Sequence, residues 1–305
     1  MNILCITPVK HLEGVAELLM TKGSTFFYEG GDKSEIRELL LMYNIDVIIC
    51  NPNQQSYIID KGLLDGTFVK IINSCSTGLN HIDIEYCESA GIKIQCHKND
   101  YKLINELPST AELALGLMMS LLRKIPTCQR HVSEYNWDYT QFMGRQVKDL
   151  KIGVVGYGRL GRMMHHYCEA LGAELYIYDP YKPEGTNSLE EVFTKCDVVS
   201  LHVHVTNETK HMINEDLLKL SKKDLYIINT SRGEIVNEQD MVSALKLGNL
   251  AGYATDVVEN EFGSLTSSPV IKAMNNGENI IVTPHVGGMT IEGQTKAYKW
   301  SIGKL

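Results

Sequence analysis

Short apolar runs alternate with longer amphipathic segments through the first hundred residues. The apolar runs fall at 2–7, 24–28, 46–50, 69–73 and 91–95. Segments such as 12–21 and 34–43 lie between them and have the periodicity of helices. Strands that alternate with helices in this way form parallel sheets covered by helices. We therefore expect an α/β domain in this part of the chain.

A second alternation of the same kind begins at residue 151. Its strand-like runs fall at 151–155, 174–178, 197–201, 225–229, 250–255 and 279–282. Six strands with helices between them are enough for a complete doubly wound parallel sheet. The chain is long enough for two domains or one large one, and each alternating region predicts a parallel sheet covered by helices.

A long apolar helix is expected between the two alternating regions. Residues 106–124 place leucine, alanine or methionine on nearly every side of a helix. A helix of this kind is buried between layers or at a subunit contact. The following segment, 130–148, is polar and predicted to be irregular.

Composition narrows the class of partner and the compartment. The chain has 305 residues, 44% of them hydrophobic, and a formal net charge of −8 with no basic cluster, which argues against nucleic acid as a partner. The longest apolar stretch, 113–122, is too short to cross a bilayer, and from the strand-like start at residues 2–6 we expect no secretory signal. The eight cysteines have no metal-binding spacing and are typical of free thiols in a reducing compartment. We expect a cytoplasmic protein with no nucleic-acid or membrane partner.

The most specific motif of the chain is the stretch 151–161, KIGVVGYGRLG. Gly156, Gly158 and Gly161 have GxGxxG spacing between a predicted strand and a helix-like segment at 162–171. The first glycine permits a tight turn, the second lets a pyrophosphate approach the backbone, and the third lets helix and strand pack closely. The helix start offers N–H groups and the positive end of its dipole to phosphates. The motif predicts a dinucleotide site.

Asp179 supports this interpretation from the next strand. It follows the predicted strand 174–178 and lies 18 residues after Gly161. A carboxylate about 20 residues beyond the motif typically binds the adenosine ribose. We therefore assign Asp179 to the cofactor site.

Three polar side chains follow three successive predicted strands. Arg232 comes after 225–229, Glu261 after 250–255, and His285 after 279–282. Ligands of open parallel sheets bind outside the carboxyl ends of the strands. If these three strands are adjacent, all three side chains project from the edge that carries the glycine motif. His285 is suited to act as the acid/base, Glu261 to orient its imidazole, and Arg232 to hold a carboxylate and polarise the adjacent carbonyl. The set predicts hydride transfer at a carbinol or carbonyl carbon.

A metal site is the weaker interpretation of the histidines. His202 and His204 are spaced like alternate residues of a strand. Two imidazoles with no third ligand nearby are poor support for a metal ion. No metal is expected.

The chain resembles the D-isomer-specific 2-hydroxyacid dehydrogenase family, which includes the D-3-phosphoglycerate dehydrogenases. The resemblance covers nearly the whole length and rests on segments that occur in the family's order: 153–161, 201–209, 229–237, 256–261 and 283–290. The family's catalytic arginine, glutamate and histidine fall on Arg232, Glu261 and His285, and its acidic ribose ligand falls on Asp179, which favours NAD over NADP.

The resemblance also implies an architecture and further contacts. It implies a Rossmann-type NAD-binding domain at 102–285 and a smaller flavodoxin-like substrate domain at 1–101 completed by 286–305. The loop Ser76, Thr77 and Gly78 is expected to bind the substrate carboxylate through backbone amides. The helix near 107–124 is expected to take part in a homodimer. Further cofactor contacts are assigned to Arg159, Leu160, His202, Thr230 and Asp256.

Four positions depart from the family's pattern. His204 replaces the usual proline beside the nicotinamide ribose, and Val258 replaces an aromatic residue. Phe262 replaces the proline after the catalytic glutamate, and Ser76 replaces the first glycine of the substrate loop. None of these changes removes a catalytic group.

Two functions of different class fit these residues. The first is an NAD-dependent oxidoreductase that acts on a small D-2-hydroxy acid or 2-keto acid. The second is a non-catalytic protein that senses NAD(H), like corepressors of the same fold family. Fold alone does not separate them. The intact set of Arg232, Glu261 and His285 favours the enzyme.

Overall fold

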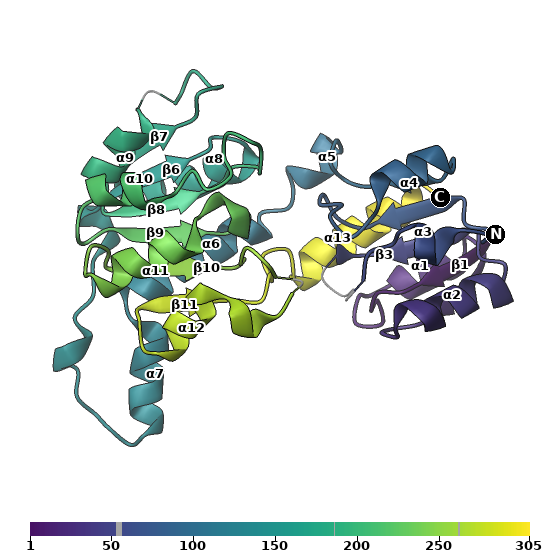
Figure 1. The fold of residues 1–305 in the computed structure, drawn as a ribbon, viewed down its shortest axis with the longest axis horizontal. Helices are drawn as coiled ribbons and strands as arrows, with labels where there is room; N and C mark the ends of the chain where they lie inside the picture. Colours follow the sequence, from purple (N-terminus) through teal and green to yellow (C-terminus); the bar gives the residue numbers. More distant parts are fainter. Residues whose placement is uncertain (53–56, 186, 262) are drawn as a thin grey trace. The chain divides into compact units, whose positions relative to one another are not determined.

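The computed structural model describes residues 1–52, 57–185, 187–261 and 263–305 and divides the chain into two compact units (Figure 1). Unit 1 comprises Met1–Leu107 and Met289–Leu305, and unit 2 comprises Pro108–Gly288. The sequence analysis placed the two domain boundaries at 101/102 and 285/286, and the boundaries between the units lie at 107/108 and 288/289.

Unit 1 is built around a five-stranded parallel sheet of order β2-β1-β3-β4-β5. This is the strand order of flavodoxin-like sheets. Strand β3 is buried along its whole length, as expected where helices cover both faces of a sheet. The strands are β1 (Asn2–Cys5), β2 (Ser24–Phe27), β3 (Val47–Cys50), β4 (Ile71–Ser74) and β5 (Lys93–Gln95). The helices are α1 (Val15–Met20), α2 (Lys33–Met42), α3 (Lys61–Leu64), α4 (Ile84–Ser89), α5 (Tyr101–Ile104) and α13 (Ile291–Gly303).

The C-terminal helix α13 completes the core of unit 1. Tyr298 and Ile302 are buried in the cluster that includes residues of β1 and α1. The Tyr298 hydroxyl lies 2.8 Å from the Thr7 hydroxyl, and Asn73 donates a hydrogen bond to the Ser301 carbonyl. These contacts join segments that are more than two hundred residues apart in the sequence.

Unit 2 has a six-stranded parallel sheet of order β11-β10-β9-β8-β6-β7. Its strand order reverses at β6, so the turn after β6 lies at a topological switch point, where doubly wound sheets bind ligands. The strands are β6 (Lys151–Val155), β7 (Glu174–Tyr178), β8 (Val198–Leu201), β9 (Tyr226–Asn229), β10 (Gly252–Thr255) and β11 (Ile280–Val282).

Alternate strand residues of unit 2 face two separate cores. Ile228 and Ala254 pack with α6 and α8 on one face, and Ile227 and Tyr253 pack with helices α9 to α12 on the other. This period of two is what a sheet covered on both faces requires. The helices are α6 (Ser109–Leu122), α7 (Ile125–Ser133), α8 (Arg159–Ala170), α9 (Leu189–Lys195), α10 (Glu215–Leu220), α11 (Glu238–Lys246) and α12 (Pro269–Asn275).

The expected fold class, two α/β domains with parallel sheets, is confirmed, and two local expectations were wrong. Helix α8 begins at Arg159 rather than near 162, because Gly158 already serves as its N-cap. Helix α7 extends to Ser133, into the segment expected to be irregular, with Pro126 in its first turn where proline is tolerated. Short 3₁₀ turns follow at Thr140–Phe142 and Val147–Asp149. Within the described residues, no helix is both long and apolar enough to span a membrane.

Candidate active site

The glycine motif forms the turn between β6 and α8. Gly156 has φ of +90°, and a Cβ at this position would lie 2.6 Å from the His202 carbonyl oxygen. A Cβ at Gly161 would lie 2.0 Å from the Gly156 carbonyl oxygen, so the helix packs against the turn only without a side chain there. Both positions therefore require glycine for reasons internal to the fold.

Gly158 differs from the other two glycines, because a Cβ there would meet no described atom within 4 Å. It is the N-cap of α8 and offers no side chain to cap the helix. Open space beside an uncapped helix start fits a pyrophosphate that approaches the backbone. Arg159 and Leu160 form the first turn of α8 beside this space.

Asp179 lies directly against the glycine turn. Its carboxylate accepts hydrogen bonds from the Tyr157 N–H at 2.8 Å and from the Tyr181 N–H at 2.9 Å. The side chain is half-buried. The carboxylate is thereby held at the end of β7 next to the space at Gly158, where a ribose hydroxyl would be in reach of its remaining lone pairs.

Two buried polar atoms near the switch point have no hydrogen-bond partner among the described residues. They are Nδ1 of His202, just after β8, and Oγ1 of Thr230, just after β9. The His202 Nε2 atom lies 2.8 Å from the Ser200 hydroxyl, and burial lowers the pKa of His202 to about 4, so its imidazole is neutral. Buried polar groups are rarely left unsatisfied. These two atoms and the open glycine turn therefore fit a dinucleotide at this edge.

The strands that precede Arg232, Glu261 and His285 are neighbours in the sheet. Strand β10 pairs with β9 on one side and with β11 on the other, all parallel. The three residues therefore follow the carboxyl ends of adjacent strands, as the sequence analysis required. The same edge carries the glycine turn after β6.

The turn that carries Arg232 is held by Asn229. Asn229 is fully buried at the end of β9, donates to the Arg232 carbonyl at 2.9 Å, and accepts from the Ser231 N–H at 3.0 Å. The Arg232 guanidinium donates to the Ser231 carbonyl at 2.7 Å and remains half-buried. A Cβ at Gly233 would lie 2.1 Å from the Val258 carbonyl carbon, so this turn packs against the loop that leads to Glu261.

Glu261 and His285 are in direct contact. The His285 Nδ1 atom lies 2.8 Å from the Glu261 Oε2 atom, with both side chains partly buried. His285 has φ of +53°, a conformation uncommon for residues other than glycine. Such local strain is typical of functional positions that the surrounding structure fixes.

Asp256 fixes the loop that carries His285. Its carboxylate accepts from the Thr283 hydroxyl at 2.5 Å, the Val286 N–H at 2.9 Å and the Gly287 N–H at 2.7 Å. The side chain is buried, and burial raises its pKa while these hydrogen bonds and the nearby His285 oppose the rise. Sequence reasoning assigned Asp256 to cofactor contact, and its carboxylate accepts hydrogen bonds from the loop that carries His285.

The predicted substrate loop follows β4 in unit 1. The Ser76 hydroxyl donates to the Gly78 carbonyl at 2.8 Å and lies 2.9 Å from the Ser74 hydroxyl. Ser74 in turn lies 3.2 Å from Nε2 of the buried His81. The serine that replaces the family's glycine therefore braces the loop around Thr77.

The other departures from the family's pattern occupy different settings. His204 is exposed, and its carbonyl accepts a hydrogen bond from the Thr209 hydroxyl at 2.6 Å. Val258 is buried against Gly233. Phe262 lies outside the described residues.

Sequence reasoning missed Glu238. This glutamate is the first residue of α11 and only 5% exposed, and it bonds the loop before Glu261. An acid in the first turn of a helix is usually a solvated residue that favours the helix dipole, so its sequence position carried no signal.

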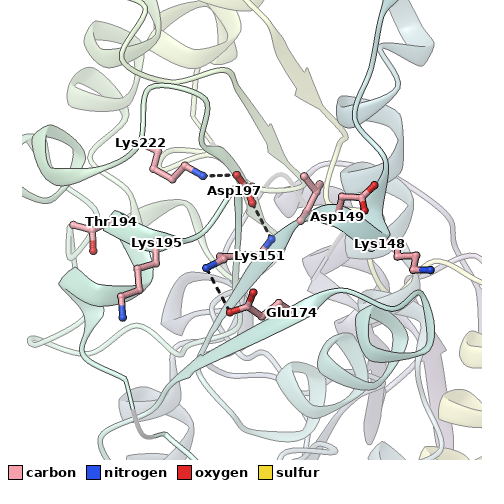
Figure 2. A pocket seen from close by; sticks show the side chains of 9 residues that line it. Lys148, Asp149, Lys151, Glu174, Thr194, Lys195, Asp197 and Lys222 are labelled. Carbon is pink, nitrogen blue, oxygen red and sulfur yellow. Dashed lines mark hydrogen bonds and ion pairs between the residues drawn. The ribbon is translucent and has the colours of Figure 1, made fainter.

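A basin of about 540 Å³ lies at the opposite, amino-terminal edge of the unit 2 sheet (Figure 2). Two of its lysines form ion pairs with lining acids: Lys222 contacts Asp197 at 2.5 Å, and Lys151 contacts Glu174 at 3.5 Å. Burial would raise the pKa of Asp197, yet hydrogen bonds from Lys222 and the Lys151 N–H outweigh burial and lower it. The basin is therefore an ion-pair network away from the glycine turn. No metal-binding group of three or more His, Cys, Asp or Glu residues occurs in the part of the chain that the structure describes.

Comparison with known proteins gives consistent similarities. Residues 115–287 match the family model for "D-isomer specific 2-hydroxyacid dehydrogenase, NAD binding domain". D-3-phosphoglycerate dehydrogenase of Methanocaldococcus jannaschii is 30% identical over 95% of this chain and 53% of its own length. Hydroxypyruvate reductase of Thermotoga maritima is 28% identical over 87% of this chain and 84% of its own. The chain spans about half the length of the D-3-phosphoglycerate dehydrogenases that it matches.

A solved structure extends the similarity to both units. D-lactate dehydrogenase of Aquifex aeolicus, solved with NAD and lactic acid, superposes with a TM-score of 0.79 and 25% identity. The superposition covers 100% of this chain and 94% of that one.

Proposed function

Because the chain belongs to the D-isomer-specific 2-hydroxyacid dehydrogenase family, with NAD as its cofactor, we propose that it interconverts a small 2-keto acid and the D-2-hydroxy acid. The observation that carries the proposal is the contact of 2.8 Å between His285 and Glu261, at the sheet edge that also carries Arg232 and the glycine turn. An acid/base pair beside a dinucleotide site is what carbonyl reduction needs.

The chain's residues divide the proton and charge chemistry between them. Bound nicotinamide supplies or accepts the hydride at the substrate's carbon 2. Glu261 holds Nδ1 of His285 and stabilises the imidazolium, so the proton passes between Nε2 and the substrate oxygen. Reduction places this proton on the former carbonyl oxygen, and oxidation removes it from the hydroxyl.

Arg232 and the unit 1 loop are assigned to substrate binding. The fixed fork of the Arg232 guanidinium suits a carboxylate and places positive charge beside the carbonyl that is reduced. Ser76, Thr77 and Gly78 are proposed to bind the substrate carboxylate through backbone N–H groups. The cofactor's pyrophosphate is assigned to Gly156, Gly158, Arg159, Leu160 and Gly161, and its ribose to Asp179. Remaining cofactor contacts are assigned to His202, Thr230 and Asp256.

The test is NADH oxidation with a panel of 2-keto acids. Glyoxylate, pyruvate, hydroxypyruvate and phosphohydroxypyruvate span small, hydroxylated and phosphorylated substrates. Turnover well above background with at least one of them is expected. Absence of turnover with all four, together with measurable NADH binding, would favour the NAD(H)-sensing alternative. The His285→Ala variant, expected to turn over at least about 100-fold more slowly, serves as the low-activity reference.

We also propose that the protein is a cytoplasmic homodimer. The segment around α7 exposes several large side chains, which is typical of an interaction surface. All eight cysteines are free thiols, in keeping with a reducing compartment.

Light scattering should give about twice the chain mass of 34.2 kDa. Replacing Trp137 and Tyr139 with aspartate should shift the mass toward that of one chain. A monomeric wild-type protein would refute the dimer. The exposed side chains are Ile125, Val132, Tyr135, Trp137, Tyr139 and Met143.

A further inference from the structure

Glu238 is a buried carboxylate with two hydrogen-bond donors. Its Oε1 atom accepts from the Glu259 N–H at 2.8 Å, and its Oε2 atom accepts from the Ser268 hydroxyl at 3.1 Å. The side chain comes from the first residue of α11, and only 5% of the residue is exposed. Each carboxylate oxygen of Glu238 thus binds a different segment of unit 2, at Glu259 and at Ser268.

Glu238 binds the loop that leads from β10 to Glu261. A hydrogen bond from the Thr255 hydroxyl to the Val257 carbonyl, at 2.6 Å, stabilises the start of this loop. Its middle packs on Gly233, where a Cβ would lie 2.2 Å from the Glu259 nitrogen. This close approach leaves the Glu259 peptide no room to move toward the Arg232 turn, and the hydrogen bond to Glu238 ties it to α11.

The Glu259 side chain is held separately from its backbone. Its Oε1 atom lies 2.8 Å from Nε2 of His211, a residue whose own N–H donates to the Glu234 carbonyl. The Glu259 residue is therefore anchored through both its main chain and its side chain. Glu261 lies only two residues further on, so the anchored Glu259 restricts where the Glu261 carboxylate can lie.

We propose that Glu238 is a positioning residue that sets the place of the Glu261 carboxylate and, through it, the orientation of the His285 imidazole. The proposal rests on the proposed function, because it assigns catalytic consequence to the pair. It complements Asp256, which fixes the other partner by binding the Val286 and Gly287 N–H groups. One buried acid thus holds each half of the His285–Glu261 contact.

The carboxyl group of Glu238 is needed as a hydrogen-bond acceptor rather than as a charge. Burial raises the pKa of Glu238, the hydrogen bonds from Glu259 and Ser268 oppose the rise, and the charge of Glu259 adds to it. A glutamine can accept from the Glu259 N–H with its carbonyl and donate to Ser268 with its amide. Glu238→Gln should therefore preserve what Glu238→Ala removes.

The experiment compares these two variants with Gln239→Ala, the adjacent exposed residue of α11, as the matched control. Glu238→Ala should lower kcat by at least about tenfold, with the KM for the keto acid and the Kd for NADH within about twofold of wild type. Glu238→Gln should stay within about threefold of the wild-type kcat, and Gln239→Ala should be unchanged.

A double variant separates positioning from general destabilisation. If Glu238 acts through Glu261, adding Glu238→Ala to Glu261→Gln should lower kcat by no more than about a further twofold. Losses in kcat that multiply fully in the double variant, or a Glu238→Ala variant with wild-type kcat, would overturn the proposal.

If Glu238→Ala does not fold, Glu238→Asp retains the charge but withdraws the carboxylate by one methylene. That variant should lower kcat at unchanged KM, and a wild-type kcat would overturn the proposal.

Nuclear magnetic resonance distinguishes failure of this proposal from failure of the proposed function. The proton on Nδ1 of His285, identified by its loss in His285→Asn, reports the contact with Glu261 without turnover. It should persist in Glu238→Gln and shift or disappear in Glu238→Ala. An unchanged signal in Glu238→Ala overturns the positioning role, whereas absent turnover in wild type overturns only the proposed enzyme.

Discussion

His285 and Glu261 are 24 residues apart and meet through a contact of 2.8 Å between Nδ1 and Oε2. Each follows one of two paired strands, β11 and β10. The backbone of His285 has a left-handed conformation, and the buried Asp256 carboxylate binds the loop that carries this residue. This geometry places Nδ1 of His285 against Glu261, and the proposed function assigns proton exchange to Nε2.

Replacing His285 with alanine removes the proposed acid/base. We expect kcat to fall by at least about 100-fold, because a positioned general acid/base contributes roughly 10²–10⁴-fold. NADH affinity should change little. His166→Ala is the control, since that histidine is exposed on α8. Near-normal turnover in His285→Ala would remove this residue from its role.

Replacing Arg232 with alanine removes the proposed carboxylate clamp. The KM for the 2-keto acid should rise and kcat should fall, while the Kd for NADH stays near the wild-type value. Arg232→Lys should recover only part of the loss, because lysine lacks the fork of donors. Steady-state kinetics with the best substrate of the panel measure both effects. Unchanged keto-acid affinity would place the substrate carboxylate elsewhere.

Replacing Asp179 with alanine removes the proposed ribose ligand. The ratio of kcat/KM for NADPH to that for NADH should increase, because the carboxylate repels a 2′-phosphate and binds a 2′-hydroxyl. Some loss with NADH is expected as well, since Asp179 also anchors the Tyr157 N–H in the glycine turn. Asp179→Asn keeps an acceptor for this N–H and is the matched control. An unaltered cofactor ratio in both variants would show that this side chain does not contact the ribose.

The buried histidines of unit 1 predict acid destabilisation. Burial lowers the pKa of His81 and of His97 to about 4, from an ordinary value of 6.5. Between these pH values the two histidines bind protons in the unfolded chain but not in the folded chain. The free energy of unfolding is therefore unaffected by them above pH 6.5 and decreases as the pH falls from 6.5 toward 4. The slope is up to about 1.4 kcal/mol per pH unit for each histidine.

Urea unfolding of the Trp137→Phe variant at pH 7.5, 6 and 5 measures this effect through Trp300, which lies in unit 1. Replacing His97 with asparagine should flatten the pH dependence, whereas replacing the exposed His11 should leave it unchanged. Equal stability of the Trp137→Phe protein at pH 7.5 and pH 5 would contradict the prediction.

Periodicity and glycine spacing determined the fold class, the strands and the dinucleotide turn. These features are local, because an apolar run or a glycine that admits no Cβ expresses a constraint on a few neighbouring residues. Gly156 and Asp179 could be assigned for this reason. The order of β9, β10 and β11 in the sheet came from the tertiary structure, because strand pairing joins segments more than twenty residues apart.

Tertiary structure alone decided how the contact between His285 and Glu261 is held. Nothing in the sequence around Glu238 distinguishes it from a solvated acid at a helix start, and its role depends on a loop twenty residues away. The same is true of the Asp256 carboxylate, which fixes a loop about thirty residues distant, and of His202, whose unsatisfied Nδ1 depends on burial. Hydrogen-bond partners and burial are properties of the packed chain, because groups remote in sequence supply them.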